Sequence, residues 1–158
     1  MSERDELTQI KNRRGFMEQA MKMNRIYKNR KAIILFADMD GLKQINDNYG
    51  HAAGDIAICA CADILKKAAG VNGIAGTLGG DEFALMMIGD ETRAIELMET
   101  VQKEIAMYNA QEKISAGTLS EKSWRKRLKW VSQMLYAADR GSSDSRILRC
   151  TSGSFIKL

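Results

Sequence analysis

Acidic residues follow two apolar segments of the chain, and they are the groups best suited to chemistry. Asp38 and Asp40 end the apolar run that begins at Lys31, and Asp81 and Glu82 follow two glycines. A carboxylate at the end of a buried strand is costly unless it is paired or binds a cation. A helix N-cap at Asp40 explains one acid of the first pair, but it explains the pair less well. If the two segments lie side by side as strands, Asp38 and Asp81 converge, and their hard oxygens suit Mg²⁺, which takes substrate phosphates as further ligands.

The glycines before Asp81, Gly79 and Gly80, allow a tight turn and the approach of a bulky ligand. They do not form a P-loop, because no glycine is followed by Lys-Ser or Lys-Thr. They do not form a dinucleotide fingerprint either, because G-x-G-x-x-G does not occur. The single histidine of the chain, His51, excludes a His-based triad of the usual kind and a His-rich metal site.

The composition is that of an ordinary folded protein. With 158 residues, 45% hydrophobic and 28% charged, the chain is expected to fold as a single domain, residues 1–158. The net charge of +4 is compatible with phosphate ligands, and the basic stretch 122–129 is more typical of a solvated helix face than of a binding site. We therefore expect no nucleic-acid partner.

Cysteine usage and hydropathy favour a location in the cytoplasm. Cys59, Cys61 and Cys150 are an odd number without the spacing of a disulfide framework, which fits a reduced cytosol, and Cys59 and Cys61 are expected to pack in a helix. The longest apolar run, residues 56–62, is too short to cross a bilayer, and the N-terminus lacks the apolar region of a secretory signal. The expectation is a cytoplasmic protein without a membrane partner.

Hydrophobic spacing predicts the elements that position the acids. A helical period occurs within residues 16–27, 57–68, 94–108 and 124–138, and a short helix is expected at 41–49, ended by Gly50. Strands are expected at 31–38, 73–78, 83–88 and 113–118, with a final pair at 146–150 and 154–158, and 79–82 as a hairpin turn. The uniformly apolar strand 31–38 is expected to be central. This order predicts an α/β (α+β) fold, with a mixed, mostly antiparallel central sheet covered by helices.

Three segments together resemble a known family. Gly79-Gly80-Asp81-Glu82-Phe83 spells GGDEF, residues 36–55 read FADMDGLKQINDNYGHAAGD, and the chain opens with Asp5-x-Leu-Thr8 followed by Asn12-Arg13-Arg14. In order and separation these segments resemble the diguanylate cyclase (GGDEF) family over nearly the whole chain. The resemblance implies a fold related to the nucleotidyl cyclases and polymerase palm domains. It also implies a reaction in which two GTP condense to cyclic di-GMP and release two pyrophosphates.

The resemblance also implies roles for individual residues. Metal ligands would be the carboxylates of Asp38 and Asp81 and the carbonyl oxygen of Met39. Glu82 would assist the metal site or the attack of the 3′-hydroxyl, with Asp81 and Glu82 as the catalytic pair. Asn46 and Asp55 would bind the guanine edge, and Lys43 with the backbone around Gly41 and Leu42 would hold the terminal phosphates. The metal would be Mg²⁺ or Mn²⁺.

Partners follow from the same resemblance. GTP would be the substrate and cyclic di-GMP the product. Because each domain holds one GTP, two domains must face each other, so a transient homodimer is implied. A sensory domain in a longer native chain is compatible with this reading.

The sequence departs from the family pattern after residue 88. Asp139 stands where a lysine is usual and Ser143 where an arginine is usual, and Arg140 and Arg146 are out of register as substitutes. Losing two charge-assisted contacts would weaken the binding of a triphosphate, at roughly 1.5–3 kcal/mol each. The alternative reading is therefore a degenerate GGDEF domain that binds GTP or a protein partner and regulates without turnover.

Other departures concern regulation and the N-terminal turn. The family's product-binding R-x-x-D motif would begin at Gly70 and end at Gly73, so feedback inhibition through that site is not expected. Thr77 stands where arginine is common, and near Gln9 a glycine is more usual.

Overall fold

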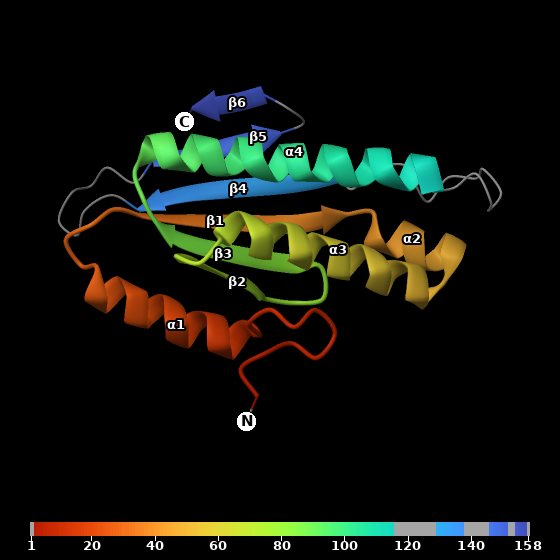
Figure 1. Cartoon of the computed structure of the whole chain (residues 1–158), viewed down its shortest axis with the longest axis horizontal. Helices are drawn as coiled ribbons and strands as arrows, with labels where there is room; N and C mark the ends of the chain where they lie inside the picture. The colour runs from red at the N-terminus through yellow and green to blue at the C-terminus, as the bar shows by residue number, and fades with distance from the viewer. Residues whose placement is uncertain (1, 116–128, 138–145, 152–153, 158) are drawn as a thin grey trace.

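The computed structural model describes residues 2–115, 129–137, 146–151 and 154–157. Helices and strands follow one another in the order shown in Figure 1. The helices are α1 (Arg13–Ile26), α2 (Leu42–Tyr49), α3 (His51–Ala69) and α4 (Glu91–Ser115). The strands are β1 (Ala32–Asp40), β2 (Gly73–Thr77), β3 (Glu82–Ile88), β4 (Lys129–Ala137), β5 (Arg146–Thr151) and β6 (Ser154–Lys157).

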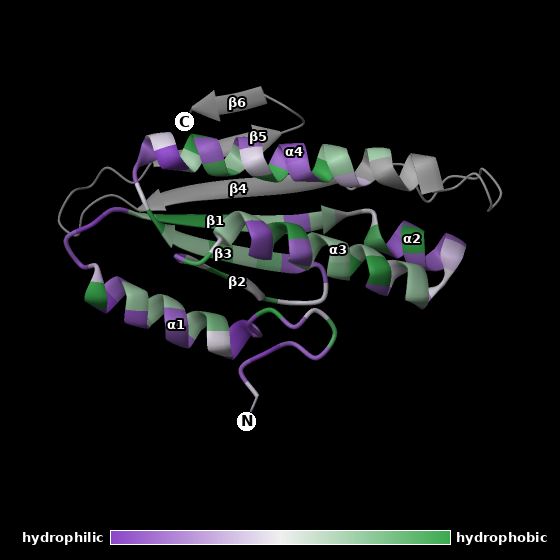
Figure 2. Ribbon diagram, viewed as in Figure 1, coloured by the Kyte–Doolittle hydropathy of each residue, from purple (hydrophilic) through white to green (hydrophobic). Residues whose placement is uncertain are grey.

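The strands form one sheet in the order β2-β3-β1-β4-β5-β6, and every neighbouring pair is antiparallel. The expectation that the apolar strand after Lys31 is central is confirmed, since β1 lies between β3 and β4. Figure 2 shows β1 as hydrophobic over much of its length. Strands β2 and β3 form the expected hairpin around Gly79 and Gly80, where the amide of Leu78 donates to the carbonyl of Glu82 at 2.8 Å.

The two faces of the sheet are covered by different helices. On one face, alternate residues of β1 and β3 pack against α3 and α4 in the larger core, which includes Ile33, Leu35, Phe83, Leu65 and Met98. On the other face, Phe16 and Met23 of α1 pack against Ala84 and Met86 of β3. The period of two along β3 therefore divides its side chains between the two layers. The predicted fold class, an antiparallel sheet covered by helices, is confirmed.

Cysteines of α3 belong to this packing. Cys61 is fully buried in the larger core, and burial raises the pKa of its thiol. Cys59 is half-buried, and its Sγ donates to the carbonyl of Leu7 at 3.5 Å. Both cysteines lie on a helix as expected, and the expected core packing is confirmed for Cys61 but not for Cys59, which belongs to neither core cluster.

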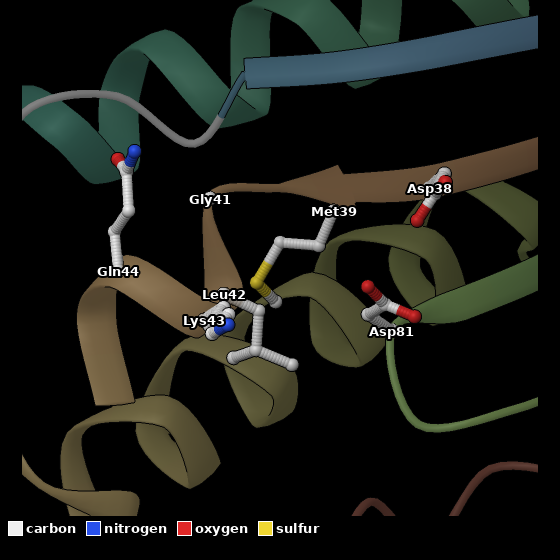
Figure 3. Close-up of a pocket in the computed structure, with 7 residues that line it drawn as sticks. All are labelled: Asp38, Met39, Gly41, Leu42, Lys43, Gln44 and Asp81. Carbon is white, nitrogen blue, oxygen red and sulfur yellow. The ribbon is translucent and has the colours of Figure 1, made fainter. Parts of the chain in front are cut away.

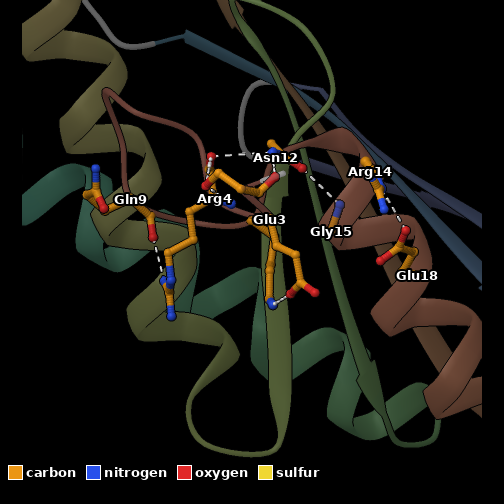
Figure 4. A network of polar contacts seen from close by, with 9 residues as sticks. Glu3, Arg4, Gln9, Asn12, Arg14, Gly15 and Glu18 are labelled. Atoms are coloured by element: carbon orange, nitrogen blue, oxygen red, sulfur yellow. Dashed lines mark hydrogen bonds and ion pairs between the residues drawn. The ribbon is translucent and has the colours of Figure 1, made fainter.

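The segment before α1 is tied to the sheet and to the helix by its own hydrogen bonds (Figure 4). The Asn12 side chain caps α1, because its Oδ1 accepts from the amide of Gly15 at 2.9 Å while its Nδ2 donates to the carbonyl of Ser2 at 2.9 Å. The backbone of Lys11 pairs with β2, donating to Ala75 at 3.1 Å and accepting from Thr77 at 2.8 Å. These bonds fix the start of α1 against the edge of the sheet.

Gln9 has a backbone φ of 61°, in the left-handed region that favours glycine. This gives a physical reason for the glycine that is more usual near this position.

Two expected elements in the second half of the chain are wrong. The strand predicted at 113–118 is helical over its described part, because α4 continues to Ser115. No glycine or proline interrupts residues 91–115, so the helix has no reason to end earlier. Residues 116–118 lie outside the described residues.

The helix predicted at 124–138 is strand β4 over residues 129–137, where the structure describes it. All nine residues of β4 pair with β1, so the backbone hydrogen-bonding groups on the second edge of the central strand find partners. Trp, Val and Tyr within this segment favour extended backbone, and a short apolar run does not distinguish helix from strand by spacing alone.

Among the described residues, none of the helices combines the length and the apolar character needed to traverse a membrane.

Candidate functional site

A pocket of about 420 Å³ lies where β1 ends and α2 begins, beside the turn of the β2–β3 hairpin. Its lining consists of two carboxylates, one cation, an amide and three less polar positions: Asp38, Met39, Gly41, Leu42, Lys43, Gln44 and Asp81. Figure 3 shows these residues around the space between β1, α2 and the start of β3.

One carboxylate lies near the end of β1, and the other lies in the turn directly before the neighbouring strand β3. Asp38 lies opposite Glu82 in the β1–β3 register, so Asp81 lies one residue beyond that pair. The amide of Met39 donates to the carbonyl of Asp81 at 2.9 Å, which holds the two backbones together. Figure 3 shows the side chains of Asp38 and Asp81 next to each other. The convergence of these two acids, expected from the sequence, is therefore present in the structure.

The opposite side of the pocket is positive. Gly41 has φ 82°, a left-handed conformation that turns the chain out of β1 and into α2. Leu42 and Lys43 are the first residues of α2, and the N-cap Gly41 supplies no side-chain hydrogen bond to the helix. The amides at a helix N-terminus point outward and attract anions, and the Lys43 ammonium adds a full charge. The pocket thus has two carboxylates on one side and a lysine beside a helix N-terminus on the other.

Gln44 also lines the pocket, and sequence reasoning did not select it. Its position directly after Lys43 in the first turn of α2 is the only signal that pointed to it.

Three of the predicted site residues lie outside this lining. Glu82 is exposed at the first position of β3, with its carboxylate beside Gly79. Asn46 lies on α2 and Asp55 on α3, where Asp55 is exposed. Asn46 Oδ1 is buried and has no hydrogen-bond partner among the described residues. The structure therefore brings six of the nine predicted residues into the lining of the pocket and leaves the other three outside it.

The pocket offers a partial set of ligands for a divalent metal. The described residues contain no group of three or more His, Cys, Asp and Glu side chains that would enclose an ion. Asp38 and Asp81 with the carbonyl of Met39 offer only hard oxygens. This partial set fits Mg²⁺, which usually keeps several waters and completes its shell with substrate phosphates.

Most of the residues that depart from the family pattern in the first half of the chain lie at the ends of helices and strands. Thr77 is buried at the end of β2, Gly70 ends α3 with φ 61°, and Gly73 begins β2. Arg146 is the first residue of β5. Asp139, Arg140 and Ser143 lie outside the described residues.

The fold is the palm-like fold of the nucleotidyl cyclase class. Residues 2–141 match the family described as "Diguanylate cyclase, GGDEF domain". The chain belongs to the GGDEF family.

Relatives and solved structures agree with this assignment. Diguanylate cyclase DgcP of Escherichia coli is 34% identical over 104 residues, which is 64% of this chain and 30% of that protein. Probable diguanylate cyclase DgcJ of E. coli is 32% identical over 113 residues, 70% of this chain and 23% of that protein. The chain therefore spans less than a third of the length of these two relatives.

Among solved structures, the GGDEF domain of DgcB from Caulobacter crescentus, crystallised with c-di-GMP, superposes with a TM-score of 0.68. It is 22% identical, with 87% of this chain and 79% of that chain covered, and so supports the fold alone. A sensory box/GGDEF family protein from C. crescentus gives a TM-score of 0.62 at 27% identity, covering 86% and 83% of the two chains.

Proposed function

We propose that this protein is a diguanylate cyclase, which condenses two GTP into cyclic di-GMP and releases two pyrophosphates with the help of Mg²⁺ or Mn²⁺. The observation that carries the proposal is the pocket in which Asp38 and Asp81 face Lys43 and the N-terminus of α2. Such a pocket suits a triphosphate with its metal, because the carboxylates hold the cation while the lysine and the helix amides hold phosphate oxygens.

In the proposed reaction the acids act at the reacting phosphate. Asp38, Asp81 and the carbonyl of Met39 would hold the metal, which when bound lowers the pKa of the attacking hydroxyl and stabilises the leaving pyrophosphate. Glu82 lies beside this set in the β1–β3 register, where it would assist either the metal site or the 3′-hydroxyl. The 3′-oxygen of each GTP would form a bond to the α-phosphorus of the other, the bond from each α-phosphorus to its pyrophosphate would break, and the two hydroxyl protons would pass to solvent.

The remaining residues bind and orient the nucleotide. Lys43 and the backbone at Gly41 and Leu42 would hold the terminal phosphates. Asn46 and Asp55 would bind guanine, with the Asp55 carboxylate accepting from N1–H and N2–H of the base. Adenine has no N1–H or N2–H, so the Asp55 carboxylate would be left without these partners and ATP would bind less well.

The assembly completes the proposal. Each copy would hold one GTP, and two copies, each a single domain over residues 1–158, would meet as a transient homodimer in the cytoplasm. The match covers only 30% of DgcP, and a longer native chain with a sensory domain would be consistent with that.

A second candidate function is a degenerate GGDEF domain that binds GTP or a protein partner and regulates without turnover. The observation that favours it is Asp139, an acid where the family usually has a lysine that contacts phosphate. A carboxylate there would repel the triphosphate.

The test is turnover of GTP at high protein concentration with Mg²⁺, with cyclic di-GMP measured by chromatography. The parent is expected to form product, and Asp81→Ala is expected to lower the rate by at least about a hundredfold, because it removes one of two metal-holding carboxylates. Glu99→Gln, an exposed change on α4, serves as the matched control and should keep parental activity.

Outcomes separate the two functions. Product from the parent supports the cyclase, and equal product from Asp81→Ala contradicts the site. GTP binding by the parent without product favours the regulator.

A further inference from the structure

The two residues proposed to bind guanine come from different helices, and α2 and α3 meet next to both of them. Gly54 lies directly before Asp55 on α3 and faces Asn46 of α2. Asn46 Oδ1 is the one buried side-chain oxygen or nitrogen without a hydrogen-bond partner in the part of the chain that the structure describes. A buried unpaired amide oxygen is unfavourable, so its placement calls for an explanation.

The backbone of α3 at Gly54 lies so close to that oxygen that a side chain would not fit between them. A Cβ at Gly54 would collide with Asn46 Oδ1 and would lie 2.9 Å from Asn46 Cγ. It would also lie 3.2 Å from Cδ1 of Leu42, a residue of the pocket. The hydrogen that glycine has in place of a side chain therefore points at the amide oxygen, and such Cα–H contacts with oxygen are weakly favourable.

Helix stability does not account for this glycine. Gly54 lies inside α3 with a buried backbone, and it is not among the glycines with positive φ, which are Gly41, Gly50 and Gly70. Alanine is more favourable than glycine within a helix. What the glycine provides here is the close approach of α3 to the Asn46 amide.

We propose that Gly54 is a positioning residue for guanine recognition. It holds the Asn46 amide with its oxygen turned toward α3, so that the amino group on the other branch of the amide is the group presented to the base. This inference rests on the proposed function, since it acts through the guanine contact assigned to Asn46. Gly54 itself does not touch the nucleotide.

The test is a double-mutant cycle with Gly54→Ala and Asn46→Ala, read by equilibrium binding of GTP and by thermal unfolding. Gly54→Ala is expected to weaken GTP binding about three- to tenfold, the usual effect of losing one hydrogen bond. The double variant should bind GTP no more weakly than Asn46→Ala alone. It should also unfold at a higher temperature than Gly54→Ala alone, because the atoms that the new methyl group meets are gone.

Gly89→Ala is the matched control. Gly89 follows β3 at the end away from Asp81, and its added Cβ would meet the Arg93 side chain, 2.8 Å from Cγ. This variant should keep parental GTP affinity, which shows that a crowded glycine-to-alanine change alone does not affect the site.

Three outcomes overturn the inference. One is a folded Gly54→Ala protein that binds GTP as the parent does. Another is a double variant whose losses in binding and in unfolding temperature add, which indicates a general packing defect. In both cases the proposed function stands if the parent binds GTP and turns it over. A parent that binds no GTP overturns the proposed function and, with it, the role of Gly54.

Discussion

Asp38 and Asp81 line the same pocket but belong to different segments of the chain. Asp38 lies near the end of β1, and Asp81 lies in the turn before β3. Their separation in sequence is bridged by the hydrogen bond between the amide of Met39 and the carbonyl of Asp81. A divalent cation bound between the two carboxylates would compensate both charges, which is the role that the proposed function gives to this pair.

At this scale we predict the effect of Asp38→Asn. The amide keeps the shape of the carboxylate and removes its charge, so the metal should bind more weakly. The concentration of Mg²⁺ needed for half-maximal cyclic di-GMP formation should rise by roughly tenfold or more, since loss of one charge-assisted contact is worth about 1.5–3 kcal/mol. The measurement is a Mg²⁺ titration of the turnover rate at saturating GTP.

Asp63→Asn is the control for this titration, because Asp63 is exposed on α3 and lies outside the pocket lining. An unchanged Mg²⁺ requirement in Asp38→Asn would contradict the assignment of Asp38 as a metal ligand.

Residue spacing predicted the meeting of the two acids better than it predicted the surroundings of Asn46, the residue proposed to bind guanine. Asp38 and Asp81 could be placed together because strands pair and their ends align. The unpaired oxygen of Asn46 and its contact with Gly54 depend on how closely two helices pack, which spacing along the chain does not reveal. Gln44 was missed for a different reason, because an exposed amide in a first helical turn has no distinctive sequence pattern.

Among the elements, α1 depends on a single side-chain cap. Asn12 both caps the helix and holds the carbonyls of Ser2 and Arg4. We predict that Asn12→Ala lowers the free energy of unfolding by about 1–2 kcal/mol, as is usual for loss of an N-cap with an added hydrogen bond. Chemical denaturation followed by far-UV circular dichroism measures the change.

Asn24→Ala makes the same exchange on the exposed side of α1 and is the control. It should be neutral or slightly stabilising, because alanine is the better helix former. Equal losses in the two variants would mean that the cap contributes nothing particular.

The elements up to β3 were predicted well, because their signals were strong. Gly50 separates α2 from α3, the glycine pair marks the hairpin, and β1 is apolar throughout its predicted length. The errors came later, where α4 extends through residues 113–115 and where residues 129–137 form β4. In both places the local pattern was compatible with either a helix or a strand. Residues 113–115 continue the helix α4, and residues 129–137 are extended because they pair with β1.

At the scale of the whole molecule, the pocket is open at one end of β1, and the proposed reaction needs two such pockets. We predict that the initial rate of cyclic di-GMP formation varies with the square of the protein concentration while the dimer is weak, so that a twofold dilution lowers the rate to about a quarter. The measurement is the initial rate over a dilution series at saturating GTP. A rate proportional to concentration throughout the series would show that a single copy, or a dimer that does not dissociate, carries out the reaction.

The segment before α1 has a further consequence for self-association. Strand β2 ends the sheet order, and an edge strand normally offers free backbone groups to which another chain can add. Here the carbonyl of Ala75 and the amide of Thr77 are already bonded to the backbone of Lys11. Another chain could therefore pair with this part of β2 only after displacing the segment before α1.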